Sequence, residues 1–109
     1  MSNEMTVRVH ADYQCFPTWV HRGHASENVA PDTLPISVGL AREFDQWGAD
    51  FDATLDQDNP VDSGFRTPQE AEDFGERGER LARRLQLELG DSTRVVYYDI
   101  RKSARVAMS

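Results

Sequence analysis

The sequence predicts an α+β fold in which two amphipathic helices cover one face of a small three-stranded sheet, in the order strand, strand, helix, helix, strand. Three observations predict this fold. A segment near the N-terminus alternates between apolar and polar residues, two long segments have apolar residues at helical spacing, and a segment near the C-terminus is rich in β-forming residues. The chain's 109 residues suit one domain. We expect this domain to span residues 1–100, with a frayed basic tail at 101–109.

Three segments are candidate strands. In "TVRVHADY", residues 6–13, Val7, Val9, Ala11 and Tyr13 alternate with polar residues, which predicts a strand with one buried face. The segment "QCFPTWV" is interrupted by Pro17, so it is either an edge strand or a bend that returns along the first strand. Residues 21–35 are expected to form a polar connection. The last strand, "TRVVYYDI", is apolar on both faces and is either central or covered on one face by another element.

The first helix is expected to begin after Ser37, a good N-cap, and to end by Asp58, because Asn59 precedes Pro60. Its apolar stripe comprises Leu40, Phe44, Trp47, Phe51 and Leu55.

The second helix has a stronger start signal. Thr67 and Glu70 form a capping box with Pro68 at the first helical position, and Gly90 is placed as a C-cap. Two outer-face pairs have i,i+4 spacing: Glu76 with Arg80, and Glu79 with Arg83. Glycine inside a helix costs about 1 kcal/mol relative to alanine. We therefore expect the helices to approach closely at their glycines, with Trp47 and Phe74 filling the space beside them; these glycines are Gly48, Gly75 and Gly78.

An acidic run at residues 43–62 is the strongest functional signal. It contains seven carboxylates and no Lys or Arg, and this equals the net charge of −7 of the whole chain. Carboxylates toward the C-terminal end of a helix are disfavoured by the helix dipole, by about 0.3–1 kcal/mol each. A local concentration of charge that opposes folding favours a surface that attracts a basic partner protein. The candidate partner-binding residues are Asp45, Asp50, Asp52, Asp56, Asp58 and Asp62.

The composition also argues against several classes of function. A net charge of −7 argues against nucleic acid or an anionic membrane as a partner, because both bind basic surfaces. No apolar stretch is long enough to span a membrane, and the N-terminus lacks the pattern of a signal peptide. The single cysteine, Cys15, fits a reducing compartment, so we expect a cytoplasmic protein.

The sequence gives only weak signals for a catalytic or metal-binding site. Cys15 lies near His10, His21 and His24 in the sequence, but strand alternation places it with Ala11 and Tyr13 on the core side, where a buried and inert thiol is expected. The Cys and His spacing matches no closed zinc site. The segment "DQDNPVDSG" fails as a calcium loop, because Pro60 and Val61 occupy positions that need a ligand and a glycine. We therefore expect no cofactor and no metal, and an enzyme is unsupported.

Several segments resemble a set of small uncharacterised actinobacterial proteins: "YQCFPTW", "NVAPDTLPIS", "WGADFDATLD", "SGF" and "LARRLQLELGD". The shared features are a Tyr-x-Cys-x-Pro-x-Trp start, a Leu-Pro-x-Ser helix entry and a Glu-Leu-Gly end, and the resemblance covers residues 7–98. Small acidic proteins of this type are similar in size and charge to bacterial immunity proteins, which bind and neutralise a toxin. The resemblance implies no site residues.

These observations favour an acidic protein-binding module, in its sharpest form an immunity protein or inhibitor that neutralises a basic partner such as a nuclease toxin by occluding its surface. One alternative is a structural or regulatory homodimer formed through the last strand, where Val96, Tyr98 and Ile100 alternate with Val95 and Tyr97. A further alternative is a small enzyme or ligand-binding domain built around Cys15, His10 and Tyr13.

Overall fold

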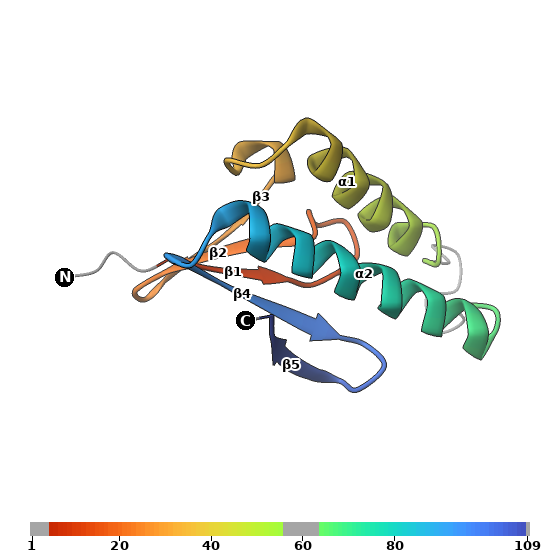
Figure 1. Cartoon of the computed structure of the whole chain (residues 1–109). Helices are drawn as coiled ribbons and strands as arrows, with labels where there is room; N and C mark the ends of the chain where they lie inside the picture. The colour runs from red at the N-terminus through yellow and green to blue at the C-terminus, as the bar shows by residue number, and fades with distance from the viewer. Residues whose placement is uncertain (1–4, 56–63, 109) are drawn as a thin grey trace.

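Two helices lie on one face of a five-stranded mixed sheet in the computed structural model, which describes residues 5–55 and 64–108 (Figure 1). The strands are β1 (Met5–Val9), β2 (Thr18–Arg22), β3 (Ala25–Val29), β4 (Thr93–Asp99) and β5 (Ala104–Ala107). Their order across the sheet is β3-β2-β1-β4-β5. The central pair, β1 and β4, is parallel, with Val7 opposite Val95, and all other pairs are antiparallel. The predicted α+β class is confirmed.

The predicted number of three strands is wrong, because both edge strands were missed. The supposed polar connection contains β3, and the tail that we expected to fray contains β5. All but the last two residues of β3 are exposed, and in β5 only Val106 is partly buried. An edge strand is held mainly by backbone hydrogen bonds to one neighbour, so its sequence need not alternate between apolar and polar residues. The "QCFPTWV" segment contributes β2, which starts directly after Pro17 and is not at the edge.

The predicted helix starts are confirmed. Helix α1 (Val38–Asp52) begins after Ser37, whose side chain accepts a hydrogen bond from the backbone N–H of Leu40 at 3.2 Å. Helix α2 (Pro68–Leu89) begins after Thr67, which caps the N–H of Glu70 at 3.1 Å, and Gly90 ends it with a φ of 82°. A short 3-10 helix, η1 (Pro31–Thr33), precedes α1.

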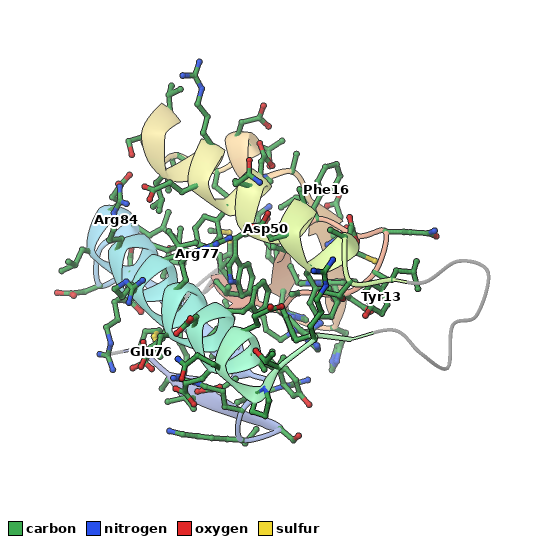
Figure 2. The ribbon with its side chains drawn as sticks, turned by 90° about the vertical axis from the view of Figure 1, so that its right-hand side faces the viewer. Tyr13, Phe16, Asp50, Glu76, Arg77 and Arg84 are labelled. Carbon is green, nitrogen blue, oxygen red and sulfur yellow. The ribbon has the colours of Figure 1, made fainter. Side chains whose placement is uncertain are left out.

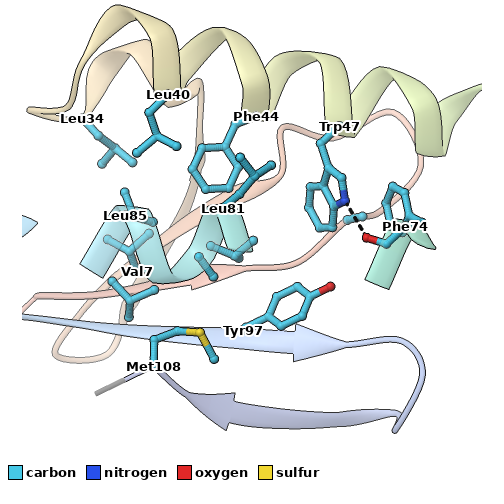
Figure 3. Close-up of a cluster of buried hydrophobic side chains, with 14 residues drawn as sticks. Val7, Leu34, Leu40, Phe44, Trp47, Phe74, Leu81, Leu85, Tyr97 and Met108 are labelled. Atoms are coloured by element: carbon cyan, nitrogen blue, oxygen red, sulfur yellow. Dashed lines mark hydrogen bonds between the residues drawn. The ribbon is translucent and has the colours of Figure 1, made fainter. Parts of the chain in front are cut away.

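The core lies between the helices and the sheet (Figure 3). At its centre Trp47 of α1 stacks on Phe74 of α2 with ring centroids 4.6 Å apart, and the Trp47 indole N–H donates to the Phe74 carbonyl oxygen at 3.1 Å. These contacts fix α1 against α2, and so fix the acidic surface that α1 carries. The sheet and helices supply the remaining large buried side chains, among them Val7, Val9, Leu40, Phe44, Leu81, Leu85, Val95 and Tyr97.

The helical glycines permit close packing, but only Gly78 does so between the two helices. A Cβ at Gly78 would lie 2.4 Å from Trp47 Cζ2 and 2.4 Å from the Tyr97 hydroxyl. At Gly75 the neighbour is the side chain of Arg101, 2.5 Å from such a Cβ, and at Gly48 it is Pro17. The expectation that all three glycines serve the contact between the helices is therefore wrong for Gly48 and Gly75.

Arg101 joins α2 to the end of β4 through carboxylates. Its guanidinium donates to both oxygens of Asp99, at 2.9 and 2.8 Å, and to Glu72 and Glu79, at 2.8 Å each. The hydrogen bond from Arg101 is the main reason that the pKa of Asp99 lies below its ordinary value. Asp99 is only 1% exposed, so this pairing is what makes its burial tolerable.

Candidate protein-binding interface

The structure describes three of the six aspartates predicted to bind a partner. Asp45, Asp50 and Asp52 all lie on α1. Asp56, Asp58 and Asp62 lie outside the described residues. Helix α1 ends at Asp52 and has no basic residue in its last turn, so Asp50 and Asp52 both lie at the negative end of the helix dipole.

On the side of α1 that faces α2, the carboxylates are paired. Asp50 accepts a hydrogen bond from Arg77 at 2.5 Å, and Glu43 pairs with Arg84. Gln46 also donates to Asp50, at 2.9 Å. In Figure 2, Asp50 and Arg77 approach each other between the two helices. The arginine is one reason that the pKa of Asp50 is lowered, although burial opposes it. Two of the four carboxylates of α1 are thus paired with arginines of α2.

On the opposite side of α1, the carboxylates have no basic partner among the described residues. Asp45 and Asp52 are seven positions apart and line the same cavity. Two acids from other segments are close to them: Asp32 acts on Asp45, and Asp12 acts together with Asp52 on the thiol of Cys15. Burial, and then the charge of Asp32, raise the pKa of Asp45. We call these four exposed residues the acidic patch: Asp12, Asp32, Asp45 and Asp52.

Beside Asp45 and Asp52 of the acidic patch lies an exposed aromatic side chain, Phe16, which is 48% exposed. The side chain of Asn28 holds its backbone on both sides: Phe16 N–H donates to Asn28 Oδ1 at 2.9 Å, and Asn28 Nδ2 donates to the Phe16 carbonyl at 2.7 Å. A cavity of about 390 Å³ beside it is lined by Phe16, Asn28, Asp45 and Asp52, among others. An apolar ring with acids beside it is a suitable anchor for a basic protein surface.

The segment that carries Phe16 is fastened to the end of α1. Asp52 Oδ1 accepts a hydrogen bond from the backbone N–H of Gln14 at 2.9 Å, where Gln14 has a left-handed φ of 61°. The Tyr13 hydroxyl lies 2.8 Å from Thr54 Oγ1, and its ring stacks on Phe51 at 4.6 Å. Figure 2 shows Tyr13 and Phe16 on the side of α1 away from α2. These contacts make Phe16 and Asp52 parts of one surface.

The expectation that Cys15 points into the core is wrong. Strand β1 ends at Val9, so the alternation does not continue to residue 15, and Cys15 is half-buried beside the cavity. Burial, followed by the charges of Asp12 and Asp52, raises the pKa of its thiol, which reduces the thiolate that a nucleophile requires.

The other residues of the proposed Cys15 site do not gather around it. His10 stacks on Tyr98 with ring centroids 4.2 Å apart, whereas Tyr13 binds the end of α1. Within residues 5–55 and 64–108, no group of three or more His, Cys, Asp or Glu side chains is arranged to hold a metal ion.

Comparison with protein families decides the class of the protein. The model of the family described as Serratia CdiI immunity protein-like matches residues 5–100. The chain belongs to this family. Membership implies that the chain neutralises a toxin of contact-dependent inhibition by binding its cognate CdiA toxin, which agrees with the immunity function predicted from charge. Comparison with curated proteins gives no match. The resemblance to actinobacterial proteins stays a prediction.

Sequence reasoning missed Asp12, Asp32 and Phe16 as members of the surface. Asp12 and Phe16 flank a turn that the sequence presented as part of a strand, and Asp32 lies in η1, so only the fold shows that they come near the acids of α1. Neither α1 nor α2, over the residues described, is long and apolar enough to cross a membrane.

Proposed function

We propose that this immunity protein neutralises a basic toxin by covering its substrate-binding surface with the acidic patch and Phe16. The sharpest form of the proposal is a nuclease toxin, whose phosphate-binding surface is cationic and matches carboxylates. The immunity protein would act in the cytoplasm, where such a toxin meets nucleic acid. Neutralisation by occlusion requires no catalytic group on this chain.

The observation that carries the proposal is the division of charge around α1. Glu43 and Asp50 face α2 and are paired with arginines, whereas Asp45 and Asp52 face outward without a basic partner among the described residues. Like charges in proximity destabilise the free protein, and a basic partner removes that cost on binding. Asp50 contributes less to partner binding, because it is already paired with Arg77, but its side chain is 40% exposed and still reaches the surface.

The surface also carries an apolar anchor. Binding energy in protein interfaces concentrates at a few large side chains that are desolvated and surrounded by polar contacts. Phe16 is suited to this role, because its exposed side chain is free to be desolvated by a partner and its backbone is fixed by Asn28. Phe16 therefore supplies affinity and the acidic patch supplies fast association, which are separable quantities.

The test measures association and dissociation rates of the chain with its CdiA toxin domain, captured on it from its source organism and identified by mass spectrometry. The paired variant Asp45→Asn/Asp52→Asn is expected to slow association at low salt, and moderate salt should abolish the difference. Asparagine at position 52 retains the oxygen that accepts from Gln14, so the loop stays in place. Phe16→Ala is expected to speed dissociation, with a loss of about 2 kcal/mol typical of a strong anchor.

A matched control removes two charges elsewhere. Glu76→Gln/Asp91→Asn alters exposed acids that make no ion pair among the described residues, on α2 and in the turn before β4. Figure 2 shows Glu76 on the far side of α2 from Phe16. The control should associate almost as fast as the wild type. Equal slowing in both double variants would mean that only net charge matters, and the acidic patch would lose its assigned role.

A further inference from the structure

The face of the sheet opposite the helices has the reverse charge. Strand alternation places Arg8, Trp19, His21, Val96, Tyr98 and Arg105 on this face, together with His10 just after β1. The helices cover only the other face (Figure 1). No described strand residue on this face is acidic, although the whole chain has a net charge of −7. We call its central side chains the cationic face: Arg8, His10, His21 and Arg105.

These four side chains lie close enough to influence one another. Burial lowers the pKa of His10 and of His21, and the positive charges of Arg8 and Arg105 contribute, whereas Asp12 opposes the lowering at His10. Arg105 likewise acts on Arg8. Arg8 also lies 5.2 Å from the centroid of the Trp19 ring, and His10 stacks on Tyr98. The face is therefore an ordered layer of two arginines, two imidazoles and aromatic rings across β2, β1, β4 and β5, and the arginines carry its positive charge.

The arginines of this face lack carboxylate partners among the described residues, unlike those packed between the helices and β4. Arg77, Arg84 and Arg101 each pair with a carboxylate, whereas Arg8 and Arg105 pair with none in the described part of the chain. Two buried polar atoms lack a hydrogen-bond partner among the described residues, Arg8 Nε and His10 Nδ1, and both belong to the cationic face. An unsatisfied buried donor is costly, so an acceptor oxygen that reached Arg8 Nε after a small movement of the side chain would remove that cost.

We propose that the cationic face docks a short, carboxylate-rich segment of a second protein, on the face of the sheet that the helices leave uncovered (Figure 1). A carboxylate supplies the acceptor atoms that the arginines lack, in a geometry that guanidinium groups bind well. Four strands at about 4.8 Å spacing make a face roughly 15 Å wide, which suits a short segment. This inference does not depend on how the acidic patch is used.

Charge and ring arrangement favour this occupant over two others. A second copy docked through the same face would place cations against cations. Single-stranded nucleic acid binds by stacking bases on free ring faces, but here Tyr98 is stacked on His10 and Trp19 lies beside Arg8. A longer polyanion would also extend beyond the face onto an otherwise acidic molecule.

The test uses fluorescence anisotropy of a short labelled oligoglutamate peptide at low salt, with an oligothymidylate of equal charge as the comparison probe. The full chain is expected to bind the peptide, and moderate salt should weaken binding. Arg105→Glu, at an exposed edge-strand position, should weaken it by roughly three- to tenfold, the effect of reversing one exposed ion pair. Arg8→Gln should also weaken peptide binding. The melting temperature of this variant is measured to verify that it folds.

The control Arg42→Gln/Arg80→Gln removes two exposed positive charges from the helices and should leave peptide binding unchanged. Absence of peptide binding, or equal binding by wild type and Arg105→Glu, overturns the proposal. Tighter binding of oligothymidylate overturns it in favour of nucleic acid. A second copy of the chain would be the occupant if the molar mass in light scattering rose with concentration and Arg105→Glu returned it to the monomer value; this result also overturns the proposal.

Discussion

The contact at Gly78 can be tested by adding a single methyl group. In Gly78→Ala the new Cβ would lie 2.4 Å from both Trp47 Cζ2 and the Tyr97 hydroxyl. Both aromatic side chains are 1% exposed, so neither can move into solvent. The substitution therefore forces α1, α2 and β4 apart at the point where they meet.

Three effects set the magnitude. Overpacking a core by one methyl group costs about 1–3 kcal/mol. Displacing the Tyr97 hydroxyl also weakens its 2.8 Å hydrogen bond to the Gly75 carbonyl, a contribution of about 0.5–1.5 kcal/mol. The better helix propensity of alanine returns about 1 kcal/mol. We expect the free energy of unfolding to fall by about 0.5–3.5 kcal/mol in total.

The assay is urea denaturation followed by far-ultraviolet circular dichroism, with Gly39→Ala as the matched control. Gly39 also lies in a helix, but a Cβ there meets nothing within 4 Å. The control should be as stable as the wild type, or more stable by up to about 1 kcal/mol. If Gly78→Ala were at least as stable as the wild type, the close approach of Trp47 and Tyr97 to Gly78 would be refuted.

Three further predictions concern other parts of the fold. Arg101→Met leaves Asp99 buried without its cation and should lower the free energy of unfolding by about 3 kcal/mol near neutral pH. Because Arg101 depresses the folded-state pKa of Asp99 below its ordinary value of 3.8, this contribution is complete above that value and is lost as pH falls through the depressed folded pKa. The difference between wild type and variant should therefore narrow in acid denaturation titrations, and a constant difference would contradict the assignment. Cys15 should react slowly with a thiol reagent at mildly alkaline pH, and Asp52→Asn should accelerate labelling by removing a charge that raises the thiol pKa; rapid labelling of the wild type would instead revive a nucleophilic role. Thr67→Ala removes the N-cap of α2 and should cost about 1 kcal/mol in urea denaturation, whereas an unchanged midpoint would show that the cap is dispensable.

Local signals in the sequence predicted the helix ends well, because a cap is a contact over three or four residues. Ser37, Thr67 and Gly90 all act as predicted. The i,i+4 pair of Glu79 with Arg83 forms as well. The edge strands could not be predicted in this way, since their positions depend on the backbone of a neighbouring strand and not on their own apolar pattern.

The candidate site was predicted only in part, because charge along a chain does not show charge in space. Asp50 was counted as free, yet Arg77, far along the sequence, comes to lie beside it when α1 and α2 pack together. Asp12 was not counted, yet the turn after β1 brings it to the same surface as Asp52. The sequence predicted a basic partner, and the fold determines which carboxylates remain free to meet one.

The parallel pairing of β1 with β4 has a consequence for when the protein becomes active. Val7 and Val95 lie side by side in the centre of the sheet, although nearly the whole chain separates them. Closing so large a loop is an entropic cost that must be met before the central contacts form. During synthesis, β1 has no partner on that side until β4 has left the ribosome, so protection against a toxin depends on complete copies of the chain. Fragments that contain all of the acidic patch but end before β4 would lack the strand that supports α2, against which α1 packs.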